Sequence, residues 1–246
     1  MTTLSNKINK FKQIISSSQN IVFFGGAGVS TESGIPDFRS AQGIFTPTGQ
    51  NIRPETVVSH SFFIHQPDQF YKFYREKLIY PEAKPNAAHL ALARLESTGK
   101  LKSVITQNID GLHQMAGSVN VAELHGSVHR NYCSKCNKFF SLEYILASST
   151  VTPYCDSCGA IVKPDVVLYE EALSDQVMTQ AVNALSNADV LIVAGTSLVV
   201  YPAAGLVNYF HGKEIVLINL SSTNLDNNAS LVINDKVGNV LSQLEQ

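Results

Sequence analysis

The four cysteines of this 246-residue chain are grouped in two pairs. Two residues separate Cys133 from Cys136, two separate Cys155 from Cys158, and 18 residues lie between the pairs. A two-residue gap lets both thiolates of one turn face a single tetrahedral centre, as in zinc ribbons. Two disulfides, or a redox pair with two further thiols, are the alternatives. Residues 1–18 lack the apolar block of a secretory signal, which favours zinc. Because four thiolates leave no position for substrate, we expect one structural zinc ion.

A glycine-rich loop, Gly26-Ala27-Gly28, directly follows an apolar run. Such a loop forms half of a dinucleotide-binding fingerprint, because the backbone can approach a phosphate closely there. Thr31 replaces the third glycine, and no acidic residue ends a second strand about 20 residues further on, so a hydride-transferring dehydrogenase is disfavoured. Residues 33–39, Ser-Gly-Ile-Pro-Asp-Phe-Arg, could cover a bound nucleotide. Taken alone, they would equally suit a packed surface turn.

Three further segments give the glycine loop a context. They are residues 106–113 (Thr-Gln-Asn-Ile-Asp-Gly-Leu-His), 123–126 (Glu-Leu-His-Gly) and 195–198 (Gly-Thr-Ser-Leu). With the cysteine pairs, these motifs resemble the sirtuin family of NAD-dependent protein deacylases, in the family's order and over almost the whole chain. Residues 80–89 and 169–171 are similar to sirtuins of Gram-positive bacteria. The resemblance implies that NAD is consumed as a co-substrate while an acyl group is removed from a lysine side chain.

The resemblance also implies a set of NAD-binding residues. Phe38 would lie near the nicotinamide ribose, Asp37 would pair with Arg39, and Asp110 would accept a hydrogen bond from the carboxamide. Thr196, Ser197 and Asn219 would hold the adenosine half. The full set is Ala27, Thr31, Phe38, Arg39, Gln107, Ile109, Asp110, Thr196, Ser197, Asn219 and Val237. Several of these residues follow predicted strands, and open α/β sheets bind ligands at the carboxyl ends of their strands.

His125 is implied as the catalytic base, and Asn108 as a residue that orders the ribose or a water beneath it. A neutral imidazole at the end of a strand could take a proton from a ribose hydroxyl near pH 7. That hydroxyl would then attack the carbon that bears the acyl group, after nicotinamide has left. The other histidines are interpreted as structural: His60, His65, His89, His113, His129 and His211.

The partner implied by the resemblance is an acylated-lysine protein or peptide, bound as an extended strand near residues 166–167 and 197–199. Glu170 fills a position where the family commonly has glycine, which affects peptide docking. Sirtuins that prefer succinyl-lysine carry a tyrosine and an arginine three residues apart in the segment 70–75. This chain keeps Tyr71 but has Tyr74 in place of the arginine. We therefore expect removal of acetyl and other uncharged acyl groups.

The elements that must position these residues follow from the hydrophobic pattern. Short apolar runs typical of buried parallel strands occupy residues 20–24, 103–107, 121–124, 166–169, 189–194 and 214–220. Helical patterns occupy residues 1–18, 86–97, 174–187 and 202–210. The alternation predicts an α/β fold, a doubly wound parallel (Rossmann-like) sheet with an inserted small domain. We expect residues 1–52, 81–130 and 160–246 to form the NAD-binding domain. Residues 53–80, a helical insert, and 131–159, a zinc ribbon, would form the small domain.

Composition limits the remaining function classes. A hydrophobic fraction of 44% with 15% charged residues is typical of a compact globular protein. Eighteen basic against twenty acidic residues argue against a nucleic-acid-binding surface. No segment has the roughly 20 apolar residues of a membrane span, so we expect a cytoplasmic protein. Two alternatives stay open: a protein mono-ADP-ribosyltransferase on the same scaffold, and a non-catalytic NAD-sensing zinc module.

Overall fold

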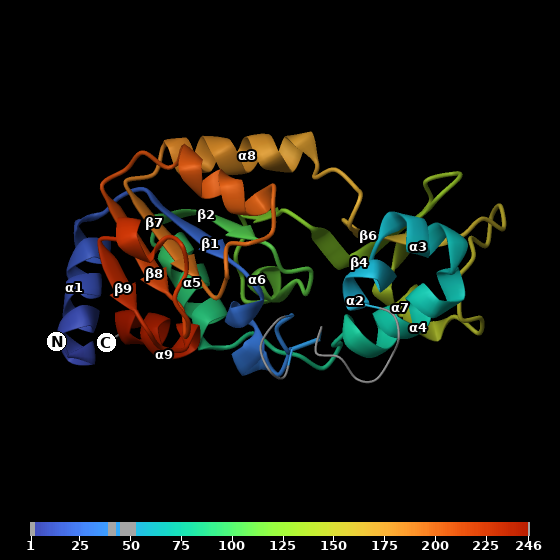
Figure 1. The fold of residues 1–246 in the computed structure, drawn as a ribbon, viewed down its shortest axis with the longest axis horizontal. Helices are drawn as coiled ribbons and strands as arrows, with labels where there is room; N and C mark the ends of the chain where they lie inside the picture. The colour runs from blue at the N-terminus through green and yellow to red at the C-terminus, as the bar shows by residue number, and fades with distance from the viewer. Residues whose placement is uncertain (1–2, 39–42, 45–52, 246) are drawn as a thin grey trace.

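A six-stranded parallel sheet forms the larger part of the molecule in a computed structural model that describes residues 3–38, 43–44 and 53–245. The strand order is β3-β2-β1-β7-β8-β9 (Figure 1). The strands are β1 (Ile21–Gly25), β2 (Leu101–Thr106), β3 (Val121–Glu123), β7 (Val190–Ala194), β8 (Glu214–Ile218) and β9 (Leu231–Ile233). Because β1 lies in the middle with crossovers to both sides, the sheet is doubly wound, and the predicted fold class is confirmed.

Helices cover both faces of this sheet. On one face lie α1 (Leu4–Ser17), α5 (Ala87–Ser97) and α9 (Val237–Leu241), which pack against the side of β1 that carries Phe23. On the other lie α8 (Asp175–Ser186) and the 3₁₀ helix η3 (Ala203–Tyr209), packed against Val22 and Phe24. Successive side chains of a strand point to opposite faces, so a wholly apolar strand is required when both faces are covered.

A second, smaller sheet of three antiparallel strands lies beside the first, in the order β5-β4-β6. Its strands are β4 (Gly126–Cys133), β5 (Phe139–Ser141) and β6 (Val162–Val166). Four helices surround it: α2 (Pro54–Val57), α3 (His60–His65), α4 (Pro67–Lys77) and α7 (Leu142–Ala147). The rings of Phe63, Phe70, Tyr71 and Tyr74 pack in a separate apolar cluster here. Among the described residues, no helix combines the length and apolarity needed to cross a membrane.

One predicted element is wrong. Residues 166–169 are not a parallel strand: β6 ends at Val166 and pairs antiparallel with β4 in the small sheet. The run is apolar because Val166 and Leu168 are buried where the chain passes between the sheets, and burial alone does not distinguish a strand from a connection. The helix predicted at residues 202–210 is present as the 3₁₀ helix η3, whereas β9, a strand of three residues, was not predicted. The remaining short helices are η1 (Ala27–Val29), η2 (Thr31–Ser33), α6 (Leu112–Met115), η4 (Asp226–Asn228) and η5 (Ser242–Glu245).

Two glycines allow the loops after β1 and β7 to touch. The N–H of Gly28 donates to the carbonyl of Gly195 at 2.8 Å. Gly195 has a φ of 59°, and a Cβ on it would lie 2.5 Å from the backbone nitrogen of Val29. Only glycine satisfies both the left-handed backbone and this close approach. The contact brings two loops together at the carboxyl edge of the sheet.

We predict that Gly195→Ala lowers the free energy of unfolding by roughly 1–3 kcal/mol more than Gly34→Ala, because overlap with fixed backbone forces local shifts. Gly34 is a matched control: its φ is 84°, and nothing in the described part of the chain lies within 4 Å of its Cβ position. Both variants share the conformational cost of a left-handed alanine. Urea unfolding measures the difference, and equal losses would contradict the steric explanation.

Candidate functional site

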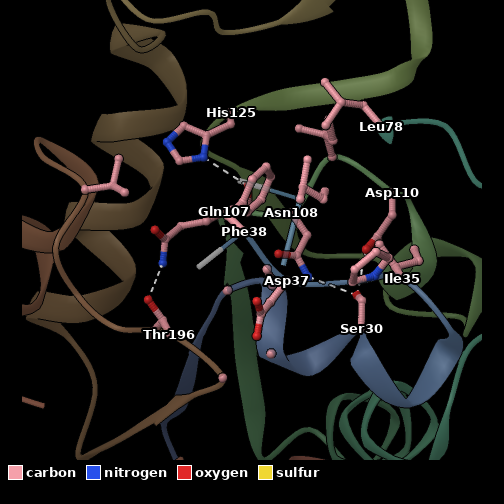
Figure 2. A pocket seen from close by; sticks show the side chains of 18 of the residues that line it. Ser30, Ile35, Asp37, Phe38, Leu78, Gln107, Asn108, Asp110, His125 and Thr196 are labelled. Atoms are coloured by element: carbon pink, nitrogen blue, oxygen red, sulfur yellow. Dashed lines mark hydrogen bonds between the residues drawn. The ribbon is translucent and has the colours of Figure 1, made fainter. Parts of the chain in front are cut away.

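A cavity of about 560 Å³ opens at the carboxyl edge of the parallel sheet and extends to the small sheet. All of the predicted NAD-binding and catalytic residues within the described chain line it: Ala27, Thr31, Phe38, Gln107, Asn108, Ile109, Asp110, His125, Thr196, Ser197, Asn219 and Val237. Arg39, with its predicted pairing to Asp37, lies outside the described residues. The fold therefore gathers segments that are far apart in the sequence around one space (Figure 2).

A hydrogen-bonded network fixes Asp110 at the cavity floor. The hydroxyl of Ser30 donates to one carboxylate oxygen of Asp110 at 2.6 Å, and the other oxygen accepts from the N–H of Leu112 at 2.9 Å. The side-chain amide of Asn108, 8% exposed, donates to Ser30 at 3.0 Å (Figure 2). Ser30 was not predicted from the sequence, although its hydroxyl lies only two residues after the glycine loop. The network orients the Asp110 carboxylate before any ligand binds.

His125 projects into the opposite side of the cavity (Figure 2). Its Nδ1 lies 2.9 Å from the carbonyl oxygen of Gln107, which can only accept. Nδ1 therefore carries the proton in the neutral ring, and Nε2 holds the lone pair. Burial lowers the pKa of His125 below 6.5, and the hydrogen bond to the Gln107 carbonyl opposes that shift. The imidazole is consequently neutral at pH 7, the form that a general base requires.

The far end of the cavity is organised by Thr196 and Asn219. The Asn219 side chain accepts from the Thr196 N–H at 3.1 Å and donates to the Thr196 carbonyl at 3.0 Å. The Thr196 hydroxyl accepts from the Gln107 amide at 2.9 Å. Val237 lies at the start of α9, where the N–H of Gly238 donates to Glu32 at 2.7 Å. Asn219 thus supports the Thr196 loop, and its direct contact with a ligand stays a prediction.

The four cysteines converge at the end of the small sheet. Their sulfur atoms all lie within 4.8 Å of one another, with Cys133 3.4 Å from Cys158 and Cys136 3.7 Å from Cys155. A disulfide needs about 2.05 Å, whereas tetrahedral Zn–S bonds of about 2.3 Å place sulfurs about 3.8 Å apart. Backbone N–H groups of residues 135 and 136 point at the Cys133 sulfur, as expected for thiolates. The cysteines form a site for one structural zinc ion.

Comparison with known proteins decides the family. A model of the Sir2 family matches residues 26–202. The chain belongs to this family. It is 63% identical to an NAD-dependent protein deacetylase of Clostridium perfringens (strain 13 / Type A), over 98% of this chain and 99% of the relative. A protein of the same name from Clostridium acetobutylicum is 60% identical over 97% of this chain and 98% of the relative.

Solved structures of Sir2 proteins share the fold. One, a Sir2 protein with a p53 peptide and NAD+, has a TM-score of 0.86 and 40% sequence identity, covering 96% of each chain. Another, Sir2Tm bound to a propionylated peptide, has a TM-score of 0.86 and 39% identity, covering 97% of each chain. Both the parallel sheet and the small cysteine-bearing unit are therefore features that this chain shares with the Sir2 family.

Glu170 shows how this member accommodates a residue where glycine is common in the family. Its φ is 76°, in the left-handed region. Its two carboxylate oxygens accept from the backbone N–H and the hydroxyl of Ser61, each at 2.9 Å. Ser61 lies in the first turn of α3, whose N–H groups lack partners within the helix. The carboxylate therefore ties the loop after β6 to the helical insert.

Tyr71 and Tyr74 are fully buried and do not line the cavity. The Tyr71 hydroxyl donates to the carbonyl of Val162, and Arg75 donates to the carbonyl of Ile145 at 2.9 Å. Burial raises the pKa of both phenols, so neither ionises near pH 7. Both tyrosines are packing residues of the helical insert. The guanidinium of Arg75 is committed to a backbone carbonyl outside the cavity.

We predict that Cys155→Ala abolishes stoichiometric zinc binding and unfolds the small sheet, because zinc binding contributes roughly 10–16 kcal/mol in small zinc-finger peptides near pH 7. Metal analysis by mass spectrometry and circular dichroism measure the two effects. Ser134→Ala, an exposed change in the same ribbon, is the control and should retain one zinc ion. Full zinc content in Cys155→Ala, or none in the unmodified protein, would contradict the assignment.

Proposed function

We propose that this protein is an NAD-dependent protein-lysine deacetylase that releases nicotinamide and O-acyl-ADP-ribose. The observation that carries the proposal is that one cavity is lined by two groups already held in place by hydrogen bonds. They are the carboxylate of Asp110 and the neutral imidazole of His125. Relatives that are 63% and 60% identical over nearly the whole chain bear the name of this activity. NAD would supply the ADP-ribosyl group that the acyl oxygen of the modified lysine attacks.

Each residue of the cavity would have a role that follows from its position. Asp110, held by Ser30 and Leu112, would accept a hydrogen bond from the nicotinamide carboxamide. The Thr196 loop would hold the adenosine half. His125 Nε2 would take a proton from a ribose hydroxyl once nicotinamide has left, because the Nδ1 proton is engaged by the Gln107 carbonyl. Asp110, the Thr196 loop and His125 all follow strands of the same sheet. Their fixed positions would place NAD and the base at a defined separation.

The acylated peptide would lie as an extended strand between the two sheets. Tyr169, which lines the cavity, and Val199, which precedes the lining residue Val200, support this proposal because both are exposed apolar residues. Main-chain pairing would give the contact little dependence on peptide sequence. The Glu170 carboxylate accepts hydrogen bonds from Ser61. It would therefore hold the loop after β6 against α3 at the edge of the peptide-binding region.

The division into an NAD-binding domain (1–52, 81–130 and 160–246) and a small domain (53–80 and 131–159) is part of the proposal. Two separate apolar clusters support a division into two domains, and the cluster of the small domain also includes Val162 and Val166 of β6. Strand β4 crosses the boundary at residue 130 and so joins the domains. A cytoplasmic location stays a prediction of the sequence.

One assay tests the proposed reaction. The protein is incubated with NAD and a peptide carrying one acetyl-lysine, and the products are separated by liquid chromatography with mass spectrometry. Equal amounts of nicotinamide, deacetylated peptide and O-acetyl-ADP-ribose are expected. ADP-ribose attached to the protein or peptide, with the acetyl group retained, would instead identify a mono-ADP-ribosyltransferase. Absence of nicotinamide release would favour the non-catalytic NAD-sensing module.

We predict that His125→Ala lowers the rate of deacetylation by about 10² to 10⁴, the usual contribution of a positioned base. Exchange of labelled nicotinamide into NAD should persist, because the histidine acts after the nicotinamide bond breaks. His211→Ala, an exposed histidine away from the cavity, is the matched control and should react at the rate of the unmodified protein. An unchanged rate in His125→Ala would show that another group is the base.

We also predict that kcat/KM for an acetyl-lysine peptide exceeds that for the same peptide with succinyl-lysine by roughly tenfold or more. A buried carboxylate without a partner costs at least about 1–3 kcal/mol. Tyr71 and Tyr74 are buried away from the cavity. Of the lysines that line it, Lys77 is paired with Glu76 at 2.8 Å, and Lys236 lies beside Val237 at the far end. Steady-state kinetics on the two peptides provide the measurement. An equal or higher succinyl value would refute this preference.

A further inference from the structure

Arg130 bridges the two sheets with one side chain. It lies on β4, and its Nη1 donates to the Glu123 carboxylate at 2.6 Å while its Nε donates to the Asp165 carboxylate at 2.8 Å. Glu123 ends β3 of the parallel sheet, and Asp165 lies on β6 of the small sheet. Figure 1 shows β4 and β6 between the parallel sheet and the helical insert. A guanidinium can bond two carboxylates in fixed directions, which an ammonium cannot do.

A break in the strand register makes this bridge possible. Ser127 pairs with Asp165, but the next pair is Asn131 with Pro164. Residues 128–130 of β4 therefore pair with no residue of β6. Within this bulge, the N–H of Val128 donates to the carbonyl of Ile109 at 3.0 Å. Bulges bend a strand and redirect its side chains, and they are common next to active sites. Here the bulge turns Arg130 toward the junction of the sheets.

The two partners of Arg130 lie on either side of His125. Glu123 precedes it by two residues. Beyond it, Gly126 has a φ of 74°, and a Cβ there would lie 1.9 Å from the backbone oxygen of Asp165. The carbonyl of His125 itself accepts from the N–H of Val167 at 3.0 Å. The backbone that carries the imidazole is thus held between β3 and β6, the two strands that Arg130 connects.

The burial of these charged side chains favours a stable bridge between Arg130 and its two carboxylate partners. The Glu123 side chain is only 10% exposed, whereas those of Arg130 and Asp165 are 38% and 42% exposed. A largely buried carboxylate needs a hydrogen-bonded partner, and Arg130 is the cation that the structure gives it. Exposed ion pairs contribute little on their own. The bond to the buried Glu123 therefore holds Arg130 in place, and the bond to the more exposed Asp165 connects Arg130 to β6.

We propose that Arg130 is a positioning residue for His125: by bonding Glu123 and Asp165, it fixes β3 against β6 and keeps the imidazole at the Gln107 carbonyl. The inference rests on the proposed role of His125 as the base. It assigns to Arg130 no contact with substrate. Displacement of the imidazole would slow the step that needs the base and spare the step before it.

The test compares Arg130→Gln with Lys138→Gln. Lys138 makes an ion pair with Asp156 at 2.6 Å in the zinc ribbon and does not line the cavity, so its variant is the matched control. In Arg130→Gln, deacetylation at saturating substrates should fall roughly tenfold or more, the scale expected for a misplaced group. Nicotinamide exchange and the KM for NAD should stay within about twofold. Arg130→Lys, which restores the charge and one bond, should recover part of the rate.

Two further measurements keep the outcome decisive. Asp165→Ala removes only the bond between Arg130 and Asp165, so it replaces Arg130→Gln if that variant unfolds. In this variant too, nicotinamide exchange should persist while deacetylation falls. The imidazole nuclear magnetic resonance signals of His125 should shift in Arg130→Gln and not in Lys138→Gln, whether or not the protein is active. Parallel losses of exchange and deacetylation, or an unshifted His125 signal, would overturn the proposal. An inactive unmodified protein would refute the proposed function instead.

Discussion

The crossing of the chain from the parallel sheet to the small sheet at Gly126 is the constraint on which the cavity depends. The backbone of this glycine approaches the carbonyl of Asp165 more closely than any Cβ would allow. The residue before it, His125, bonds through its own carbonyl to Val167. One short segment therefore joins the sheets and presents the imidazole to the space between them. Any movement of one sheet against the other would also move that imidazole.

Several polar groups around the cavity form hydrogen bonds with other groups of the protein. Ser30, Asn108 and Asp110 bond to one another, and Thr196 is held by Asn219 and Gln107. A network of this kind orients its members without a ligand, so binding need not reorganise them. The same internal bonding explains why these segments lie together although they are far apart in the sequence. Their strands end at one edge of the sheet, and the side chains complete one another's hydrogen bonds there.

The motifs predicted the fold class and the zinc site because both depend on short-range chemistry. Paired cysteines require one turn each, and apolar runs require covered strands. The connection at 166–169 was mistaken for a strand because its apolar residues are buried by the junction of the sheets. The bulge in β4 left no signal, since Arg130 resembles any surface arginine until its partners on β3 and β6 are placed. Ser30 was overlooked because its role depends on Asp110, 80 residues away.

Strand β4 links the zinc ribbon to the cavity. It begins at Gly126, directly after His125, and ends at Cys133, whose sulfur belongs to the zinc site. Between these ends the bulge carries Arg130 to both neighbouring strands. The metal fixes the far end of the strand, the arginine fixes its middle, and the close approach of Gly126 fixes its start. Four thiolates leave zinc no position for substrate, so a zinc ion at this site would have a structural role and would hold the end of the strand that begins beside His125.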